Sequence, residues 1–161
     1  MDSLGLSVTD FFLLDQLRIY PVAISDEDNE SSLAFEELAT HIENEEKSNV
    51  IVVDALTTMV AQSEGAQIRD FFLRCKSLCD AGKVIICTVH SGAIDEDVLT
   101  RVRSICDAYL QLEVEASGTQ LVKTIKVAKI RGAEEATGGI IGFEVDPGLG
   151  IRIIPISTAR A

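Results

Sequence analysis

A carboxylate and two hydroxyl groups stand directly after a short apolar run in the first half of the chain. The run is Val-Ile-Val-Val at residues 50–53, and Asp54, Thr57 and Thr58 follow it. Four aliphatic residues in a row make both faces of a strand apolar, as in a parallel sheet covered by helices, and ligands bind outside the carboxyl ends of such strands. Asp54 is therefore placed to hold Mg²⁺ through water beside a bound nucleotide, with Thr57 and Thr58 next to it. The alternative is that Asp54 only caps the turn or helix that follows.

A histidine ends the next apolar run along the chain. This run covers residues 84–89, and His90 follows it. If residues 64–81 form a helix between the two runs, the strands are parallel neighbours joined by a right-handed crossover. Asp54 and His90 would then stand at the same edge of the sheet, where an imidazole can sense a γ-phosphate. The alternative is a surface histidine without a role.

Two cations lie close together near the end of a later strand, at Lys129 and Arg131. Residues two apart in a strand share a face, and Gly132 lets the backbone turn away after them. An arginine fork beside a lysine point charge suits a phosphate group. The alternative is that both cations balance nearby carboxylates, for example Glu134 and Glu135.

Several catalytic and phosphate-binding motifs are missing from this sequence. It contains no G-x-x-x-x-G-K-[ST] pattern, and its only Gly-Lys pair, Gly82-Lys83, leads into an apolar strand where no phosphate cradle forms. No Ser-His-Asp set and no Cys-His pair stands in a recognisable context. The cysteines lie in apolar stretches without a C-x-x-C pair, so we interpret them as packing residues rather than metal ligands or redox groups. They are Cys75, Cys79, Cys87 and Cys106.

The composition bounds the classes of function. The chain has 161 residues, 47% hydrophobic, and a formal net charge of −12. This length fits one domain, residues 1–161. Without a basic stripe the chain is not expected to bind nucleic acid, which disfavours a relative of the DNA recombinases. With no apolar run of membrane-span length and no signal peptide, we expect a cytoplasmic protein without a membrane span.

Much of the negative charge is concentrated in residues 26–46, a segment without lysine or arginine. We interpret this acidic segment first as a solvated loop followed by the exposed face of a helix. Alternatively it docks a basic partner, which would make the chain a nucleotide-independent interaction module. Its carboxylates are Asp26, Glu27, Asp28, Glu30, Glu36, Glu37, Glu43, Glu45 and Glu46.

Hydrophobic periodicity predicts an α/β fold with a parallel sheet that has helices on both faces, followed by a C-terminal antiparallel hairpin extension. A polar loop is expected after Asp54, and Gly82 is expected to end the long helix. The predicted helices cover residues 8–14, 32–44, 64–81 and 95–106. The predicted strands cover residues 17–22, 50–53, 83–90, 109–115, 121–129, 140–146 and 151–156.

With these motifs the chain resembles the RecA/KaiC-like ATP-binding family and, within it, the accessory proteins H of the archaellum, the archaeal flagellar motor. The resemblance runs over essentially the whole chain and implies a RecA-like P-loop NTPase core that is truncated, lacking the P-loop strand and helix. It is carried by residues 50–54, 85–90, 129–133 and, most specifically, 141–157.

The resemblance also implies roles for the candidate site residues. Asp54 corresponds to the Walker B carboxylate, which holds Mg²⁺ through water, and His90 to the residue near the γ-phosphate of ATP. Lys129 and Arg131 correspond to the pair that reaches toward nucleotide on the adjacent subunit of KaiC-like rings. Such proteins bind ATP with little or no hydrolysis of their own.

The family assembles at the cytoplasmic base of the motor, peripheral to the membrane. Its implied partners are the hexameric secretion ATPase, the polytopic membrane platform protein and a ring-forming scaffold, and a homo-oligomer is compatible with the resemblance. Family members carry a glycine-rich phosphate loop ahead of the segment that matches Met1. Lacking its backbone donors and lysine, this chain is expected to bind ATP weakly. Family members also carry another strand there that normally lies centrally, so apolar faces and strand edges are expected to be bare in this chain.

Overall fold

The computed structural model describes residues 7–22, 31–117, 120–132 and 139–154. The chain divides into two compact units. The first, here called the helical unit, is Val22–Cys106, and the second, the sheet unit, combines Met1–Pro21 with Asp107–Ala161. Each unit is described by itself, and the prediction of one domain over residues 1–161 stays a prediction.

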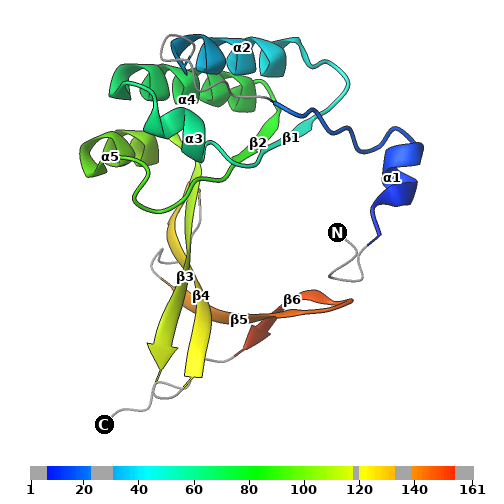
Figure 1. The fold of residues 1–161 in the computed structure, drawn as a ribbon, viewed down its shortest axis with the longest axis vertical. Coiled ribbons are helices and arrows are strands. Elements are labelled where there is room, and N and C mark those ends of the chain that lie inside the picture. The colour runs from blue at the N-terminus through cyan, green and yellow to red at the C-terminus, as the bar shows by residue number, and fades with distance from the viewer. Residues whose placement is uncertain (1–6, 23–30, 118–119, 133–138, 155–161) are drawn as a thin grey trace. The chain divides into compact units, whose positions relative to one another are not determined.

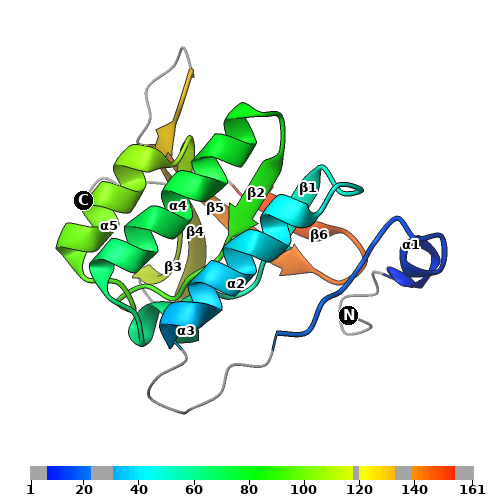
Figure 2. The same cartoon turned by 90° about the horizontal axis from the view of Figure 1, so that it is seen from above.

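The helical unit is built around two parallel strands. Its elements are α2 (Ser31–Asn44), β1 (Val50–Val53), α3 (Thr57–Ala61), α4 (Gly65–Asp80), β2 (Val84–Cys87) and α5 (Glu96–Ile105). β1 and β2 pair in parallel, from Val50 opposite Val84 to Val53 opposite Cys87, as the predicted crossover through α4 requires. α4 contacts both α2 and α5 and lies between them (Figures 1 and 2).

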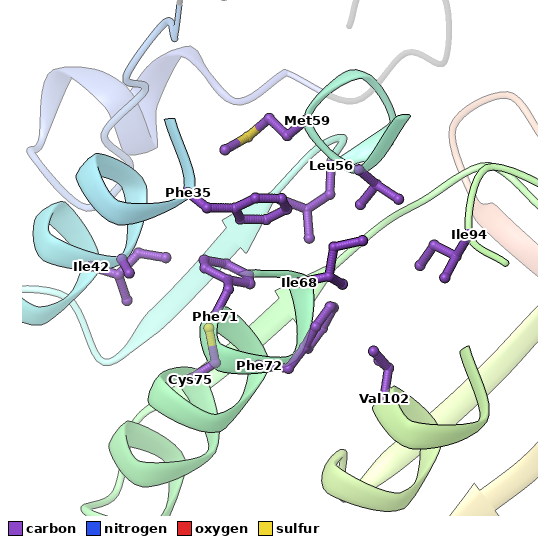
Figure 3. Packing of buried hydrophobic residues seen from close by; sticks show 12 residues of the cluster. Phe35, Ile42, Leu56, Met59, Ile68, Phe71, Phe72, Cys75, Ile94 and Val102 are labelled. Atoms are coloured by element: carbon purple, nitrogen blue, oxygen red, sulfur yellow. The ribbon is translucent and has the colours of Figure 1, made fainter. Parts of the chain in front are cut away.

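One hydrophobic core holds these elements together. In α4 the buried side chains recur at the helical period, at Ile68, Phe71, Phe72 and Cys75, so one side of the helix is apolar. The ring of Phe71 lies 5.0 Å from that of Phe35 in α2, and Figure 3 shows both among the neighbouring core side chains. Cys75 is buried in this core, as its interpretation as a packing residue predicts, and burial raises the pKa of its thiol to about 12.

The helices cover one face of the parallel pair. Ile51, Val53, Ile85 and Cys87 pack against the core, whereas the alternate strand residues are exposed. Among the described residues, the expectation of helices on both faces is therefore met on one face only. The bare apolar face agrees with the expectation that such surfaces are left uncovered in this chain. Its members are Val50, Val52, Val84 and Ile86, each about half exposed or more.

The sheet unit contains a four-stranded antiparallel sheet in the order β3-β4-β5-β6. Its elements are α1 (Thr9–Leu13), β3 (Ala108–Ser117), β4 (Gln120–Ile130), β5 (Ile140–Asp146) and β6 (Gly150–Ile154). Both predicted hairpins are present, and the pairing of β4 with β5 joins them into one sheet. The tip of the first hairpin, at residues 118–119, lies outside the described residues, as does the end of the predicted strand 151–156.

Two element predictions are wrong. Residues 17–22 form no strand, although their β-branched and aromatic side chains favour one. A strand needs a partner for its ladder, and Pro21 lacks the N–H that a ladder uses. The polar loop expected after Asp54 instead contains the helix α3, because Met59 and Val60 are buried in the core. None of the helices in the described part of the chain is long and apolar enough to cross a membrane.

Candidate functional site

The carboxyl ends of β1 and β2 are tied together by backbone hydrogen bonds beyond the strands themselves. Asp54 follows β1 and Thr88 follows β2. The N–H of Thr88 donates to the carbonyl oxygen of Val53 at 3.0 Å, and the N–H of Leu56 donates to the carbonyl oxygen of Thr88 at 2.9 Å. The two chain segments that leave the strands are therefore held side by side.

Two side-chain hydrogen bonds cross between the same segments. The hydroxyl of Thr88 donates to the Oδ1 carboxylate oxygen of Asp54. In the same direction, from the segment after β2 to the segment after β1, the N–H of His90 donates to the hydroxyl oxygen of Thr57 at 3.0 Å. Asp54, after β1, is thus bonded to Thr88, after β2, and His90, after β2, is bonded to Thr57, after β1. Asp54 and His90 lie at the same edge of the pair, where both are exposed.

The local fold explains why the hydroxyl groups come to this edge. Leu56 is fully buried and anchors the segment that follows Asp54. The peptide bond between Asp54 and Ala55 is cis. α3 begins at Thr57, and Thr58 occupies its next position, where it is exposed. Both threonines therefore lie in the first turn of a helix that starts three residues after the carboxylate.

The donor set at this edge fits the Mg²⁺ ion of a bound nucleotide better than a metal held by protein alone. No group of three or more His, Cys, Asp or Glu side chains in the described part of the chain could hold a metal ion. Mg²⁺, however, is usually held by one or two carboxylates together with phosphates and water. Asp54 supplies such a carboxylate, and after accepting one hydrogen bond it retains acceptor capacity on its oxygens.

The cationic pair belongs to the sheet unit. Lys129 lies in β4 opposite Tyr109, and Arg131 follows the end of that strand. The guanidinium Nη1 of Arg131 lies 3.1 Å from the carboxylate of Asp107, and the backbone N–H of Arg131 donates to the backbone carbonyl oxygen of Asp107 at 2.7 Å. Arg131 therefore balances a carboxylate, as the alternative interpretation held, though the partner is Asp107. Glu134 and Glu135 lie outside the described residues.

This ion pair leaves Arg131 available to other anions. The side chain of Arg131 is 67% exposed and that of Asp107 is 42% exposed. Exposed pairs of this kind contribute only about 0–1 kcal/mol to stability. A phosphate group can therefore compete with Asp107 for the guanidinium.

Thr88 is the residue at this edge that sequence reasoning missed. It was counted as part of the predicted strand 83–90, whereas β2 ends at Cys87. The sequence alone carries no signal for it, because the register that sets Thr88 beside Asp54, with Val53 opposite Cys87, is known only from the structure. Lys83, from the Gly-Lys pair, donates to the carbonyl oxygens of Glu45 and Ser48 and so has a structural role.

The acidic segment is partly neutralised by one arginine from α4. The guanidinium of Arg74 contacts Glu43 at 2.6 Å and Glu36 at 2.8 Å. Its hydrogen bond holds the pKa of Glu43 below the ordinary value. The Glu45 carboxylate accepts hydrogen bonds from the backbone N–H groups of Lys47 and Ser48, which follow α2. A docking role would thus rest on the remaining carboxylates, of which those at residues 26–30 lie outside the described part of the chain.

Comparisons with known proteins bear on the fold and the family of this chain. The family profile described as "ATPase: KaiC" matches residues 2–158. The solved flagellar accessory protein FlaH from Methanocaldococcus jannaschii superposes with a TM-score of 0.79 at 26% identity, covering 96% of this chain and 69% of that one. A KaiC-like protein from Pyrococcus horikoshii has the same fold, with a TM-score of 0.62 at 17% identity, over 96% of this chain and 68% of that one. Fold and profile together define a KaiC-type, RecA-like domain of the mixed α/β class.

Curated relatives narrow the family further. The archaeal flagellar ATP-binding protein FlaH of Sulfolobus acidocaldarius is 32% identical over 168 residues, a match that spans 100% of this chain and 71% of that protein. FlaH of Methanococcus voltae is 25% identical over 138 residues, which is 85% of this chain and 59% of that protein. The chain belongs to the FlaH family within the KaiC-type ATPases. Both levels of the resemblance seen in the sequence are thereby confirmed.

Proposed function

We propose that this chain binds ATP together with Mg²⁺ at the carboxyl ends of β1 and β2. The observation that supports it is the pair of hydrogen bonds, donated by Thr88 and His90, that brings Asp54, Thr57 and His90 to one edge. In this role Asp54 holds Mg²⁺ through water, and Thr57 and Thr58 flank the phosphates. The ion neutralises phosphate charge when bound.

Three further residues are proposed to contact phosphate. His90 senses the γ-phosphate, and its N–H bond to Thr57 links it to the segment that carries Asp54. Lys129 and Arg131 serve nucleotide on an adjacent subunit, so this role rests on assembly of a homo-oligomer. Arg131 would exchange its exposed partner Asp107 for phosphate oxygens.

The binding is weak and regulatory in this proposal, without hydrolysis. A chain that contains no G-x-x-x-x-G-K-[ST] motif lacks the backbone donors and the lysine that cradle β- and γ-phosphates. Losing these contacts costs several kcal/mol, which turns micromolar into about millimolar affinity. No residue of the site is assigned a catalytic role.

The names of the relatives support a place in the archaeal flagellar machinery. The matched proteins are called archaeal flagellar ATP-binding protein and flagellar accessory protein. We propose that this chain acts in archaeal motility at the cytoplasmic side of the motor. Its partners there would be the secretion ATPase, the membrane platform protein and the ring scaffold.

A thermal-shift titration tests the nucleotide proposal. With a dissociation constant of about 1 mM, 10 mM Mg-ATP stabilises the protein by about 1.4 kcal/mol. This corresponds to a rise in Tm of about 3–6 °C for a chain of this size, whereas 0.1 mM nucleotide leaves Tm almost unchanged. The Asp54→Asn variant, which keeps the shape of the side chain, should lose most of the shift. A large shift at micromolar nucleotide would refute weak binding, and no shift at 10 mM would refute ATP binding itself.

A further inference from the structure

Thr88 makes three hydrogen bonds at the carboxyl ends of the parallel strands. Its backbone N–H and carbonyl oxygen bind Val53 and Leu56, one on each side of Asp54, and its hydroxyl donates to the Asp54 carboxylate. The two backbone bonds already hold the segment after β1 against the segment after β2. The hydroxyl bond is therefore not needed to join the strands, and what it determines is the direction of one carboxylate.

The direction of that carboxylate matters because Asp54 is exposed. An exposed aspartate without a fixed partner samples several rotamers, and ordering it on binding costs free energy. A hydroxyl donor on Oδ1 selects one orientation in advance. Groups that orient a metal-binding carboxylate in this way typically tune metal affinity by about tenfold or more.

We propose that Thr88 is a positioning residue, whose hydroxyl orients the Asp54 carboxylate toward the Mg²⁺-bound water of the nucleotide. The inference rests on the proposed function, since it assigns Asp54 to the nucleotide's metal. It is distinct from the roles of Thr57 and Thr58, which lie on α3 and follow Asp54 in the chain. The geometry also distinguishes Thr88 from a capping residue, because its hydroxyl bonds a side chain 34 residues away and no helix end.

The test measures how strongly Mg²⁺ improves ATP binding. Amide signals of the full chain are followed by NMR during titration with ATP to about 10 mM, once with Mg²⁺ and once with EDTA, a range that covers millimolar affinities. Mg²⁺ should raise the affinity of the wild-type protein about tenfold, and Thr88→Val should remove most of that gain while leaving binding in EDTA unchanged. Valine keeps the β-branched shape and both backbone hydrogen bonds of Thr88.

Two companion variants identify the acting group. Thr88→Ser restores the hydroxyl and should restore the Mg²⁺ gain. Thr100→Val removes an exposed threonine hydroxyl in α5 that bonds only the carbonyl oxygen of Glu96, so it should change nothing. In a double-mutant cycle, Thr88→Val should cost nothing further in an Asp54→Asn background, because both changes remove the same interaction.

The outcomes separate the two levels of the inference. If Asp54→Asn loses the Mg²⁺ gain and Thr88→Val keeps it, the positioning role is overturned and the nucleotide site stands. The positioning role also fails if Thr88→Ser is as impaired as Thr88→Val, or if Thr100→Val shows the same loss. If the wild-type signals do not move with ATP at all, the proposed function fails and this inference fails with it.

Discussion

The two units of the chain bury their apolar side chains to very different degrees. Of the thirteen buried hydrophobic residues in the described part of the chain, twelve form the core of the helical unit. The remaining one is Phe143, in β5 of the sheet unit. On β3, by contrast, Leu112 and Val114 are 63% and 62% exposed. The helical unit therefore contains its own core, whereas most of the sheet's apolar face lies open.

The difference follows from the geometry of the elements. Helices α2, α4 and α5 present apolar stripes that converge on the inner face of two short strands, so each stripe finds partners from several elements. A single antiparallel sheet has one apolar face and needs a second layer to cover it. The sheet unit is thus held by its backbone ladder and by cross-strand pairs, which contribute less per residue than core packing.

Removing a core ring should have the largest effect on stability. Phe71 is 2% exposed and packs against two other rings, so Phe71→Ala should lower the free energy of unfolding by about 3–5 kcal/mol, measured by urea denaturation. The matched change on the open sheet is Leu112→Ala, which should cost less than about 0.5 kcal/mol because the side chain is already largely in water. Equal costs would mean that the apolar face of the sheet is covered in solution, and the contrast between the units would be lost.

A glycine at a close contact between two helices allows a second comparison of the units, with a smaller expected change in stability. A Cβ added at Gly65, at the start of α4, would lie 2.8 Å from Cγ2 of Val98 in α5. Gly65→Ala should therefore cost about 1–3 kcal/mol through overpacking, since valine is stiff about χ1. Gly139→Ala, beside the sheet, meets nothing within 4 Å and should stay within about 0.5 kcal/mol of wild type.

The double variant Gly65→Ala with Val98→Ala checks the cause. Removing the Val98 methyl groups clears the contact, so the second change should restore part of what the first one lost. Simple addition of the two costs would show that steric contact between α4 and α5 is not the reason.

Much of this fold could be predicted from the sequence because its signals are local. The apolar runs 50–53 and 84–89 indicated parallel strands, Gly82 ended α4 in a left-handed conformation, with φ of 106°, and alternation predicted both hairpins. The helix α3 was missed because its five residues are too short for periodicity, and burial of Met59 and Val60 decides it instead. The strand predicted at 17–22 is absent although its residues favour a strand, because local propensity cannot supply the neighbouring strand that a ladder needs.

Only part of the candidate site could be predicted from the sequence. Asp54 and His90 could be found because each follows an apolar run, and parallel strands bring their carboxyl ends to one edge. Thr88 could not be found, because its role depends on register, which a run of four aliphatic residues in each strand does not specify. The sequence pattern made Arg131 a candidate phosphate ligand, and that role stays a prediction. Its pairing with Asp107 spans 24 residues and needed the structure.

The smallest effect on stability is expected from removing one ion pair, and each unit offers one pair for comparison. Arg74 holds Glu43 in the helical unit at 2.6 Å, and Arg152 holds Glu144 across β5 and β6 at 2.7 Å. The pKa of Glu43 is lowered from its ordinary 4.5, first by the Arg74 hydrogen bond. A carboxylate with a lowered pKa stabilises the fold above its unfolded pKa and loses that contribution as pH falls through the lowered value.

Glu43→Gln should therefore cost about 1 kcal/mol at pH 7, a value limited by solvent screening because the Glu43 side chain is 38% exposed. The difference from wild type should disappear as the pH falls from about 4.5 through the lowered pKa, measured by urea denaturation at each pH. Glu144→Gln removes a more exposed pair, at 57% and 54%, and should cost less than about 0.5 kcal/mol at pH 7. A Glu43→Gln penalty that persists in acid would mean that the neutral side chain packs poorly, since a charge interaction must vanish once the wild-type carboxylate is protonated.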